Sequence, residues 1–286
     1  MKTVTSLSGG MSSAMCEVVA PADYLVFALV RSENPKTLYP DAKVRQMVSD
    51  RIGKDFIGTM EDDKIIYTML DLEQYFGKYI KWVSGDTFES VCDYGGGWLP
   101  SALRRYCTTH MKIDPIVKWW AKELQMQPVE MSIGYRCTEG KRVKKMLNKL
   151  NKKGLQEHET SFGKHKDGPY KGKNKWETVE WRVPKFPLFE RNIDKTDVRN
   201  YWKNKPVRFA QHNNCVGCFH RSPSLLKYMS ENHENKYAAF IDLEQIGKGT
   251  FKKNISYQKI TTLNFTGNLF AQDDEQEGCN SGFCGF

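Results

Sequence analysis

Apolar residues in the first third of the chain come in short runs separated by polar and glycine-rich stretches. Residues 3–7 form a β-prone run, and residues 24–30 are almost wholly apolar, as in a strand that is buried on both faces of a parallel sheet. Residues 14–20 have the composition of a helix, and residues 38–52 place apolar side chains on one helical face. A further apolar run, residues 64–70, predicts a third strand. This alternation predicts right-handed βαβ units in a doubly wound, mostly parallel α/β sheet of Rossmann-like type.

The rest of the chain continues the alternation and then changes character. Further elements are predicted at residues 113–124 (helix), 128–135 (strand), 177–183 (strand), 194–202 (helix) and 223–247 (helical). Lysine and arginine dominate residues 141–176, which we interpret as a basic insertion that holds a short helix and then a flexible excursion. We therefore expect an α/β domain over residues 1–220 and a helical extension with a cysteine-bearing tail over residues 221–286.

The composition of the chain indicates its expected cellular location, the chemistry of its cysteines and the kind of partner it could bind. The longest apolar run is residues 24–30, too short to cross a bilayer, and no convincing secretion signal precedes it, so we expect a cytoplasmic protein with no membrane partner. Eight cysteines in such a chain predict metal or redox chemistry rather than a disulfide framework. The net charge of +9 permits an anionic partner such as a nucleotide or nucleic acid.

A glycine- and serine-rich turn joins the first predicted strand to the first predicted helix. It contains Ser8, Gly9, Gly10, Ser12 and Ser13. Two glycines let the backbone turn sharply, hydroxyls add donors, and the start of a helix presents free N–H groups, all of which suit a phosphate. No lysine follows the second glycine, so this is not a G-x-x-x-x-G-K-[ST] loop. An ordinary strand–helix connection is the alternative.

Two later segments carry basic residues suited to an anion. Arg105 and Lys112 flank Cys107 just before a predicted helix, and these cations would favour its thiolate form. Arg136 and Arg142 follow a predicted strand, with Glu139 between them as a candidate to orient both. The basic stretch 141–175, with its interleaved aromatic residues, is a candidate grip for nucleic acid, and a merely solvated insertion is equally compatible with it.

Cysteines near the end of the chain have metal-ligand spacing. Cys215 and Cys218 form a C-x-x-C pair, which lets two thiolates converge on one metal ion, and His220 lies two residues beyond. The tail adds Cys279 and Cys284 as candidate further ligands. A free or redox-active dithiol remains the alternative.

Four of these segments resemble the phosphoadenosine phosphosulfate (PAPS) reductase-like family, in a form often found in phages. This family belongs to the adenine nucleotide alpha-hydrolase superfamily, together with the N-type ATP pyrophosphatases. The matching patterns are S-G-G-x-x-S at residues 8–13, R-x-C-T-x-x-x-K-x-x-P at residues 105–115, G-x-R-x-x-E-x-x-R at residues 134–142 and C-x-x-C-F at residues 215–219. Many members have an aspartate where this chain has Ser12, which favours the reductase-like branch over the ATP-cleaving one.

The resemblance implies an oxidoreductase that acts on an adenylyl sulfate or a related activated substrate. It implies that an adenine nucleotide, ATP or PAPS, is held by Ser8, Gly9, Gly10, Ser12, Ser13, Glu33, Arg136 and Arg142, and that Cys107, Arg105 and Lys112 carry the chemistry. It further implies a [4Fe–4S] cluster, or otherwise zinc, on Cys107, Cys215, Cys218 and Cys284, and an electron donor such as thioredoxin. Two alternatives stay open: an ATP-dependent enzyme that modifies sulfur or bases in tRNA or DNA, and a zinc-bearing nucleic-acid-binding protein without activity.

Overall fold

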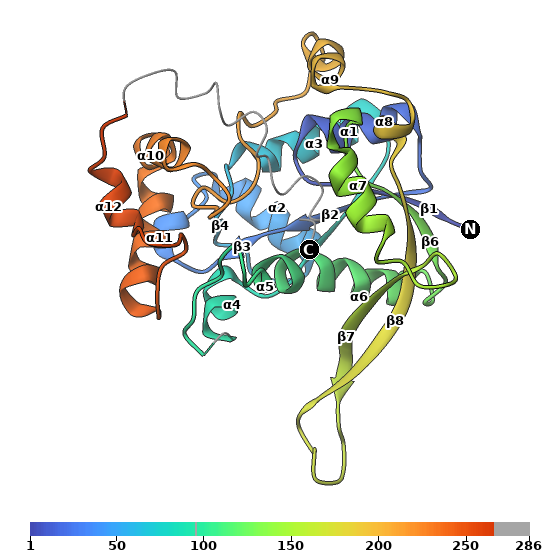
Figure 1. Ribbon diagram of the computed structural model, residues 1–286, viewed down its shortest axis with the longest axis horizontal. Helices are drawn as coiled ribbons and strands as arrows, with labels where there is room; N and C mark the ends of the chain where they lie inside the picture. The colour runs from blue at the N-terminus through green and yellow to red at the C-terminus, as the bar shows by residue number, and fades with distance from the viewer. Residues whose placement is uncertain (95, 266–286) are drawn as a thin grey trace.

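A six-stranded, mostly parallel sheet forms the centre of the protein, as the computed structural model shows for residues 1–94 and 96–265 (Figure 1). The strand order is β5-β2-β1-β6-β8-β7, and every neighbouring pair is parallel except β7 and β8. The strands are β1 Thr3–Leu7, β2 Tyr24–Leu29, β5 Ile80–Ser84, β6 Val129–Ser132, β7 Gln156–Lys164 and β8 Asn174–Lys185; β3 Arg31–Ser32 and β4 Gly58–Thr59 form a separate antiparallel pair. The predicted α/β class with a mostly parallel sheet is confirmed.

The chain changes direction across the sheet between β1 and β6. From β1 it builds outward through β2 to β5, and it then returns to add β6 on the other side of β1. In open α/β sheets ligands bind outside the carboxyl ends of the strands at such a switch point. The turn that follows β1 and the segment that follows β6 therefore flank the place where this architecture favours a ligand.

Helices cover both faces of the sheet, so the doubly wound arrangement is also present. They are α1 Met11–Val19, α2 Ala42–Ile52, α3 Lys64–Phe76, α4 Phe88–Tyr94, α5 Tyr106–Thr108, α6 Asp114–Glu123, α7 Gly140–Leu147, α8 Pro187–Glu190, α9 Lys195–Trp202, α10 Pro223–Asn232, α11 Glu234–Ile246 and α12 Tyr257–Thr261. No helix in the described residues is long and apolar enough to cross a membrane.

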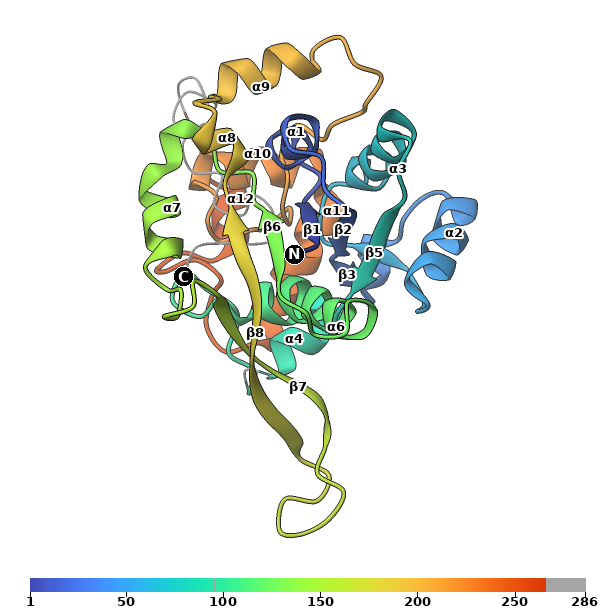
Figure 2. The same ribbon diagram turned by 90° about the vertical axis from the view of Figure 1, so that its right-hand side faces the viewer.

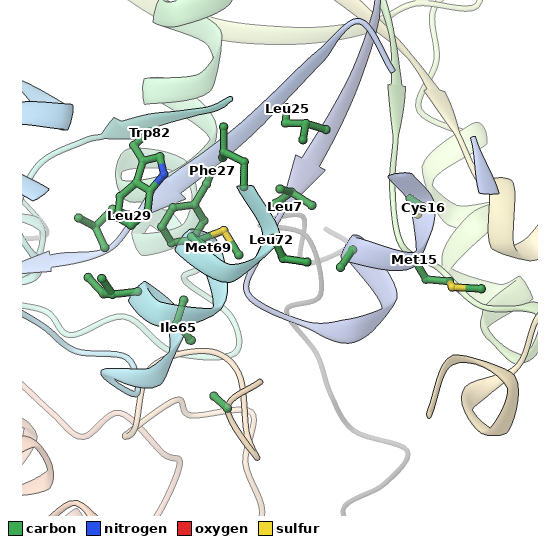
Figure 3. Close-up of a cluster of buried hydrophobic side chains, with 14 of the residues drawn as sticks. Leu7, Met15, Cys16, Leu25, Phe27, Leu29, Ile65, Met69, Leu72 and Trp82 are labelled. Atoms are coloured by element: carbon green, nitrogen blue, oxygen red, sulfur yellow. The ribbon is translucent and has the colours of Figure 1, made fainter. Parts of the chain in front are cut away.

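Side chains of β2 alternate between two apolar layers. Leu25, Phe27 and Leu29 pack with α1 and α3 on one face, as Figure 3 shows. Val26 and Ala28 point to the opposite face and pack against α6. Because successive residues of a strand point to opposite faces, an almost continuous apolar run is what a strand covered on both sides requires.

A third apolar cluster joins the C-terminal helices to the rest of the molecule. Residues of α10, α11 and α12 pack in it together with α4 and with Cys107 and Met111. Helices α10, α11 and α12 follow residue 220, and they lie against the segment that holds Cys107.

The prediction of a strand at residues 64–70 was wrong. These residues begin α3, and the third parallel strand is the short β5. Ile65, Met69 and Leu72 recur at helical spacing and are all buried, so the apolar run was one face of a helix. Gly77 ends that helix in the left-handed conformation, with φ of 59°.

The basic insertion also differs from expectation. Its helix is present as α7, but the stretch expected to be a flexible excursion forms β7, which pairs with an extended β8 in an antiparallel hairpin. The hairpin reaches well beyond the body of the protein in both Figure 1 and Figure 2.

Candidate functional site

The turn after β1 has the shape that the sequence predicted, and its own hydroxyls hold it. Gly9 has φ of 80°, a region that favours glycine. The Ser13 hydroxyl accepts from the Ser8 N–H at 3.1 Å and donates to the Gly10 carbonyl at 2.9 Å. Gly10 is the N-cap of α1, and within the described chain no side chain caps this end. The first amides of a nine-residue helix therefore point toward the switch point, while Ser13 serves the loop itself.

Two other segments lie directly against this turn. A Cβ on Gly134, just past β6, would lie 2.8 Å from the Ser13 nitrogen, so only glycine allows this close approach. A Cβ on Gly10 would lie 2.1 Å from the Asn213 amide nitrogen. The turn thus touches both the segment that leads to Arg136 and the segment that leads to Cys215.

Arg136 and Arg142 share one carboxylate. The Glu139 Oε2 atom lies 3.2 Å from Arg136 Nε, and its Oε1 atom pairs with an Arg142 guanidinium nitrogen. The Arg142 guanidinium also lies 4.2 Å from the ring centre of Tyr135. Glu139 therefore contacts both arginines, as the sequence suggested, and Arg136 is nearly buried two residues after Gly134.

Further basic groups gather between these arginines and the thiols. Burial, together with nearby Arg105, Lys252 and Arg142, lowers the pKa of His220 to about 4. Burial also lowers the pKa of Arg105, which lies close to Cys107 and Cys218. The cations around the neutral imidazole repel one another, and an anion bound among them would offset this repulsion. The region is therefore electrostatically suited to a phosphate or a sulfate.

The three predicted site cysteines meet in the described structure. Cys107, Cys215 and Cys218 line one cavity of about 30 Å³, together with His220. Burial, chiefly, raises the pKa of the Cys107 thiol to about 11, although nearby Lys112 opposes this, and burial raises that of Cys215 as well. The prediction that Arg105 and Lys112 favour the thiolate of Cys107 was therefore wrong, because removal from water outweighs the nearby positive charge. The three thiols therefore lie together next to the basic groups, although they come from segments that are far apart in the sequence.

Metal binding fits this cavity in its chemistry but not in its geometry. Three thiols and an imidazole are ligands that zinc prefers, and the buried His220 Nε2 atom has no hydrogen-bond partner among the described residues. Yet in residues 1–94 and 96–265 no three His, Cys, Asp or Glu side chains are gathered to hold one metal ion. The cavity has room for one water-sized species, so a four-iron cluster would require its walls to move apart.

Lys112 lies at the edge of the same cavity and is paired with Glu61. Its Nζ atom lies 2.8 Å from Glu61 Oε1, and the two side chains are 8% and 2% exposed. Although burial disfavours the charged amine, the Glu61 carboxylate and nearby Cys215 raise the pKa of Lys112. Glu61 and Cys215 also form an isolated antiparallel β-bridge. The ion pair therefore lies directly beside the thiol cavity.

The remaining predicted residues lie apart from this cluster or outside the described residues. Glu33 follows β3 with an exposed side chain, and its N–H donates to Glu89 Oε2 at 3.0 Å. Ser12 is buried beside Gly134 in the first turn of α1. Cys279 and Cys284 lie outside the described residues.

Sequence reasoning missed several residues of this site. Glu61, Asn213 and Lys252 all lie in or beside it, yet none stands in a recognisable pattern. The run Glu61-Asp62-Asp63 was the one available signal for a charged group here, and such runs are usually solvated.

Comparison with known proteins gives no match to any protein-family model, and none to curated proteins or solved structures.

Proposed function

We propose that the chain binds an adenine nucleotide at the switch point between β1 and β6 and acts on an adenylyl sulfate or a related activated substrate. One observation carries the proposal: Gly134 lets the segment before Arg136 contact the start of α1 at this switch point. The amides at the start of α1 and the arginines that follow β6 therefore belong to adjoining segments at this edge of the sheet. The family resemblance supplies the choice of an adenine nucleotide, ATP or PAPS, and favours PAPS. A cytoplasmic location is part of the proposal.

In this proposal some residues bind the nucleotide and others carry out the reaction at sulfur. The amides at the start of α1, with Arg136 and Arg142, bind the nucleotide phosphates. Arg105 and Lys112 hold the sulfate end near Cys107, which requires the walls of the small cavity to move apart. The Cys107 thiol, whose pKa is raised, gives its proton to water, and its sulfur attacks the sulfate sulfur while the sulfur–oxygen bond to the nucleotide phosphate breaks. The nucleotide leaves with the electron pair of that bond. Cys218 then attacks the thiosulfonate sulfur of Cys107, which releases sulfite and leaves a Cys107–Cys218 disulfide. An external dithiol of the thioredoxin kind reduces that disulfide.

Nucleotide binding can be tested with a matched pair of glycine variants. Gly134→Ala places a methyl group against backbone atoms of Ser12 and Ser13, whereas nothing lies within 4 Å of the same addition at Gly163. We expect wild type and Gly163→Ala to bind ATP or PAPS by calorimetry, and Gly134→Ala to bind at least tenfold more weakly. If wild type binds neither nucleotide, or if Gly134→Ala binds as well as Gly163→Ala, the proposed site is wrong.

The role of the cysteines is tested separately, by metal content. The thiol reaction above predicts that anaerobically purified protein is colourless, contains no stoichiometric metal and releases sulfite from PAPS with reduced thioredoxin. Stoichiometric zinc, or a brown protein with iron and sulfide, would instead assign Cys107, Cys215 and Cys218 to a metal centre. Loss of that metal in Cys218→Ser would confirm the reassignment.

A second candidate is an ATP-dependent enzyme that modifies nucleic acid on the same core. It is favoured by the basic hairpin of β7 and β8, whose tip carries five lysines and one carboxylate between residues 160 and 176. Turnover of ATP that depends on added tRNA or DNA, in place of sulfite release from PAPS, would select it.

A further inference from the structure

The hairpin of β7 and β8 forms one wall of a groove that is separate from the thiol cavity. The groove has a volume of about 740 Å³ and lies between the hairpin, the end of β5 and the start of α6. Figure 1 shows the hairpin leaving the body beside α6, and Figure 2 shows it from the side. Its volume falls within the range of about 300–1,000 Å³ that is typical of ligand-binding clefts.

Lysines outnumber carboxylates in the walls of this groove. Lys54 and Lys118 line it from the body, and Lys164 lines it from the hairpin. Burial, together with nearby Arg31 and Lys118, lowers the pKa of Lys54, as expected where cations crowd one another. Of the groove's carboxylates among the described residues, Asp86 is exposed, and Asp114 is buried and held by two histidines.

Aromatic side chains stand open to solvent in the same groove. Trp176 is 53% exposed and Phe162 is 40% exposed, and both come from the hairpin. Tyr94 stacks on His110 at 5.4 Å on the opposite wall. Exposed aromatic rings among lysines are what proteins use to stack the bases of an unpaired strand while cations follow its phosphates.

A buried carboxylate fixes the hairpin against the body. Asp114 at the start of α6 accepts from His158 Nε2 of β7 at 2.7 Å, and its other oxygen lies 3.2 Å from His110 Nδ1. These contacts join both walls below the groove. The groove is therefore largely formed before a ligand arrives, which reduces the ordering that binding requires.

We propose that this groove binds single-stranded nucleic acid, with lysines Lys54, Lys118 and Lys164 at phosphates and Trp176 stacked on a base. A single strand is favoured over a duplex because only unpaired bases can stack on these rings. The proposal goes beyond the nucleotide site and does not depend on it, since no residue named for the groove contributes to the switch point.

The test compares two double variants of the same hairpin. Lys164→Ala/Trp176→Ala removes one lysine and one aromatic ring from the groove. Lys175→Ala/Tyr170→Ala likewise removes one lysine and one aromatic ring, but neither residue lines the groove, and Lys175 points to the opposite side of the strand from Trp176. The binding of a fluorescein-labelled, mixed-sequence 15-nucleotide strand, as DNA and as RNA, is measured by anisotropy between 50 and 300 mM NaCl.

We expect micromolar or tighter binding of the single strand by wild type at 50 mM salt, with weaker binding of the matching duplex. The groove variant should bind at least tenfold more weakly, with a salt slope smaller by about 0.7, and the control variant within about threefold of wild type. Photocrosslinking of a bromouridine- or bromodeoxyuridine-containing strand to wild type should label Trp176 or Phe162, a readout that needs no variant.

Three results would overturn the proposal: no binding at 50 mM salt, equal losses in the two variants, or duplex binding as tight as that of the single strand. The nucleotide proposal is separated from this one by Gly134→Ala, which should keep its affinity for the strand. Conversely, the groove variant should keep the wild-type affinity for ATP and PAPS.

Discussion

Replacing Lys112 by methionine would leave the Glu61 carboxylate buried without its partner, and we expect this single change to destabilise the protein strongly. The two charges lie 2.8 Å apart and are almost wholly removed from water. Breaking such a pair by removing one member costs about 3–5 kcal/mol, because the other charge stays in a poorly solvating site. That is a large share of the roughly 5–15 kcal/mol by which a folded protein is stable.

The measurement is urea unfolding of four proteins: wild type, Lys112→Met, Glu61→Gln and the double variant. We expect each single variant to lose about 3–5 kcal/mol, and the double variant to lose less than either, because no unpaired charge remains in it. Lys185→Met is the matched control, since its partner Glu130 lies 3.1 Å away but the two side chains are 42% and 38% exposed. This exposed pair should contribute about 0–1 kcal/mol.

Two results would refute this reasoning. Single variants that stay within about 1 kcal/mol of wild type would show that the site solvates an unpaired charge well. A double variant whose loss equals the sum of the single losses would show that the two side chains do not interact. An unchanged slope of unfolding free energy against urea is needed for either conclusion, since a changed slope signals a different unfolded state.

Three further predictions concern single positions. Burial opposes ionisation of Asp114, but its hydrogen bonds from two histidines outweigh burial and lower the pKa of the carboxyl group to about 2, so the stabilisation that the carboxylate gives is present above pH 4 and is lost as the pH falls toward 2. Between pH 4 and pH 2 the unfolding free energy of wild type should fall about 2 kcal/mol further than that of Asp114→Asn. Parallel curves for the two proteins would contradict this prediction. A Cβ on Gly217 would lie 2.5 Å from the Phe240 ring, so Gly217→Ala should lower the free energy of unfolding in urea by about 1–3 kcal/mol. Adding Phe240→Leu should restore part of that loss, and an equal loss with and without Phe240→Leu would exclude the contact. Gly9→Ala combines a φ of 80° with a Cβ 2.7 Å from the Ile65 side chain, and it should lower the melting temperature by a few degrees and weaken ATP binding, whereas Gly163→Ala should do neither.

The sequence predicted the parts of the fold that repeat a simple local pattern. The apolar run of β2 and the glycines after β1 each identify their element without help from distant residues. The start of α3 was misread because a short apolar run fits a buried strand as well as one face of a helix, and the two are separated by the residues beyond it. Local patterns therefore gave the class of the fold, but not every element of it.

The sequence likewise predicted some contacts of the candidate site and missed others. The family resemblance implied that Cys107 and Cys218 belong to one site, and in the structure they line one cavity although they are far apart in the chain. It gave no indication of Glu61 as the partner of Lys112, or of the contact between Asp114 and His158 that fixes the hairpin. Each of these pairs forms only after distant segments pack, and nothing near either residue specifies its partner.

The place of β1 in the sheet has a consequence for synthesis on the ribosome. β1 precedes the other strands of the sheet in the sequence, yet it is an inner strand, and β6, which pairs with one of its edges, begins about 120 residues after Leu7. At about 5–20 residues per second, that edge waits roughly 6–24 s for its partner. During this interval the nascent chain exposes an unpaired strand edge that can join the wrong neighbour. β1 and the turn that follows it, where we propose the nucleotide binds, thus belong to a part of the chain that benefits from protection by a chaperone during synthesis.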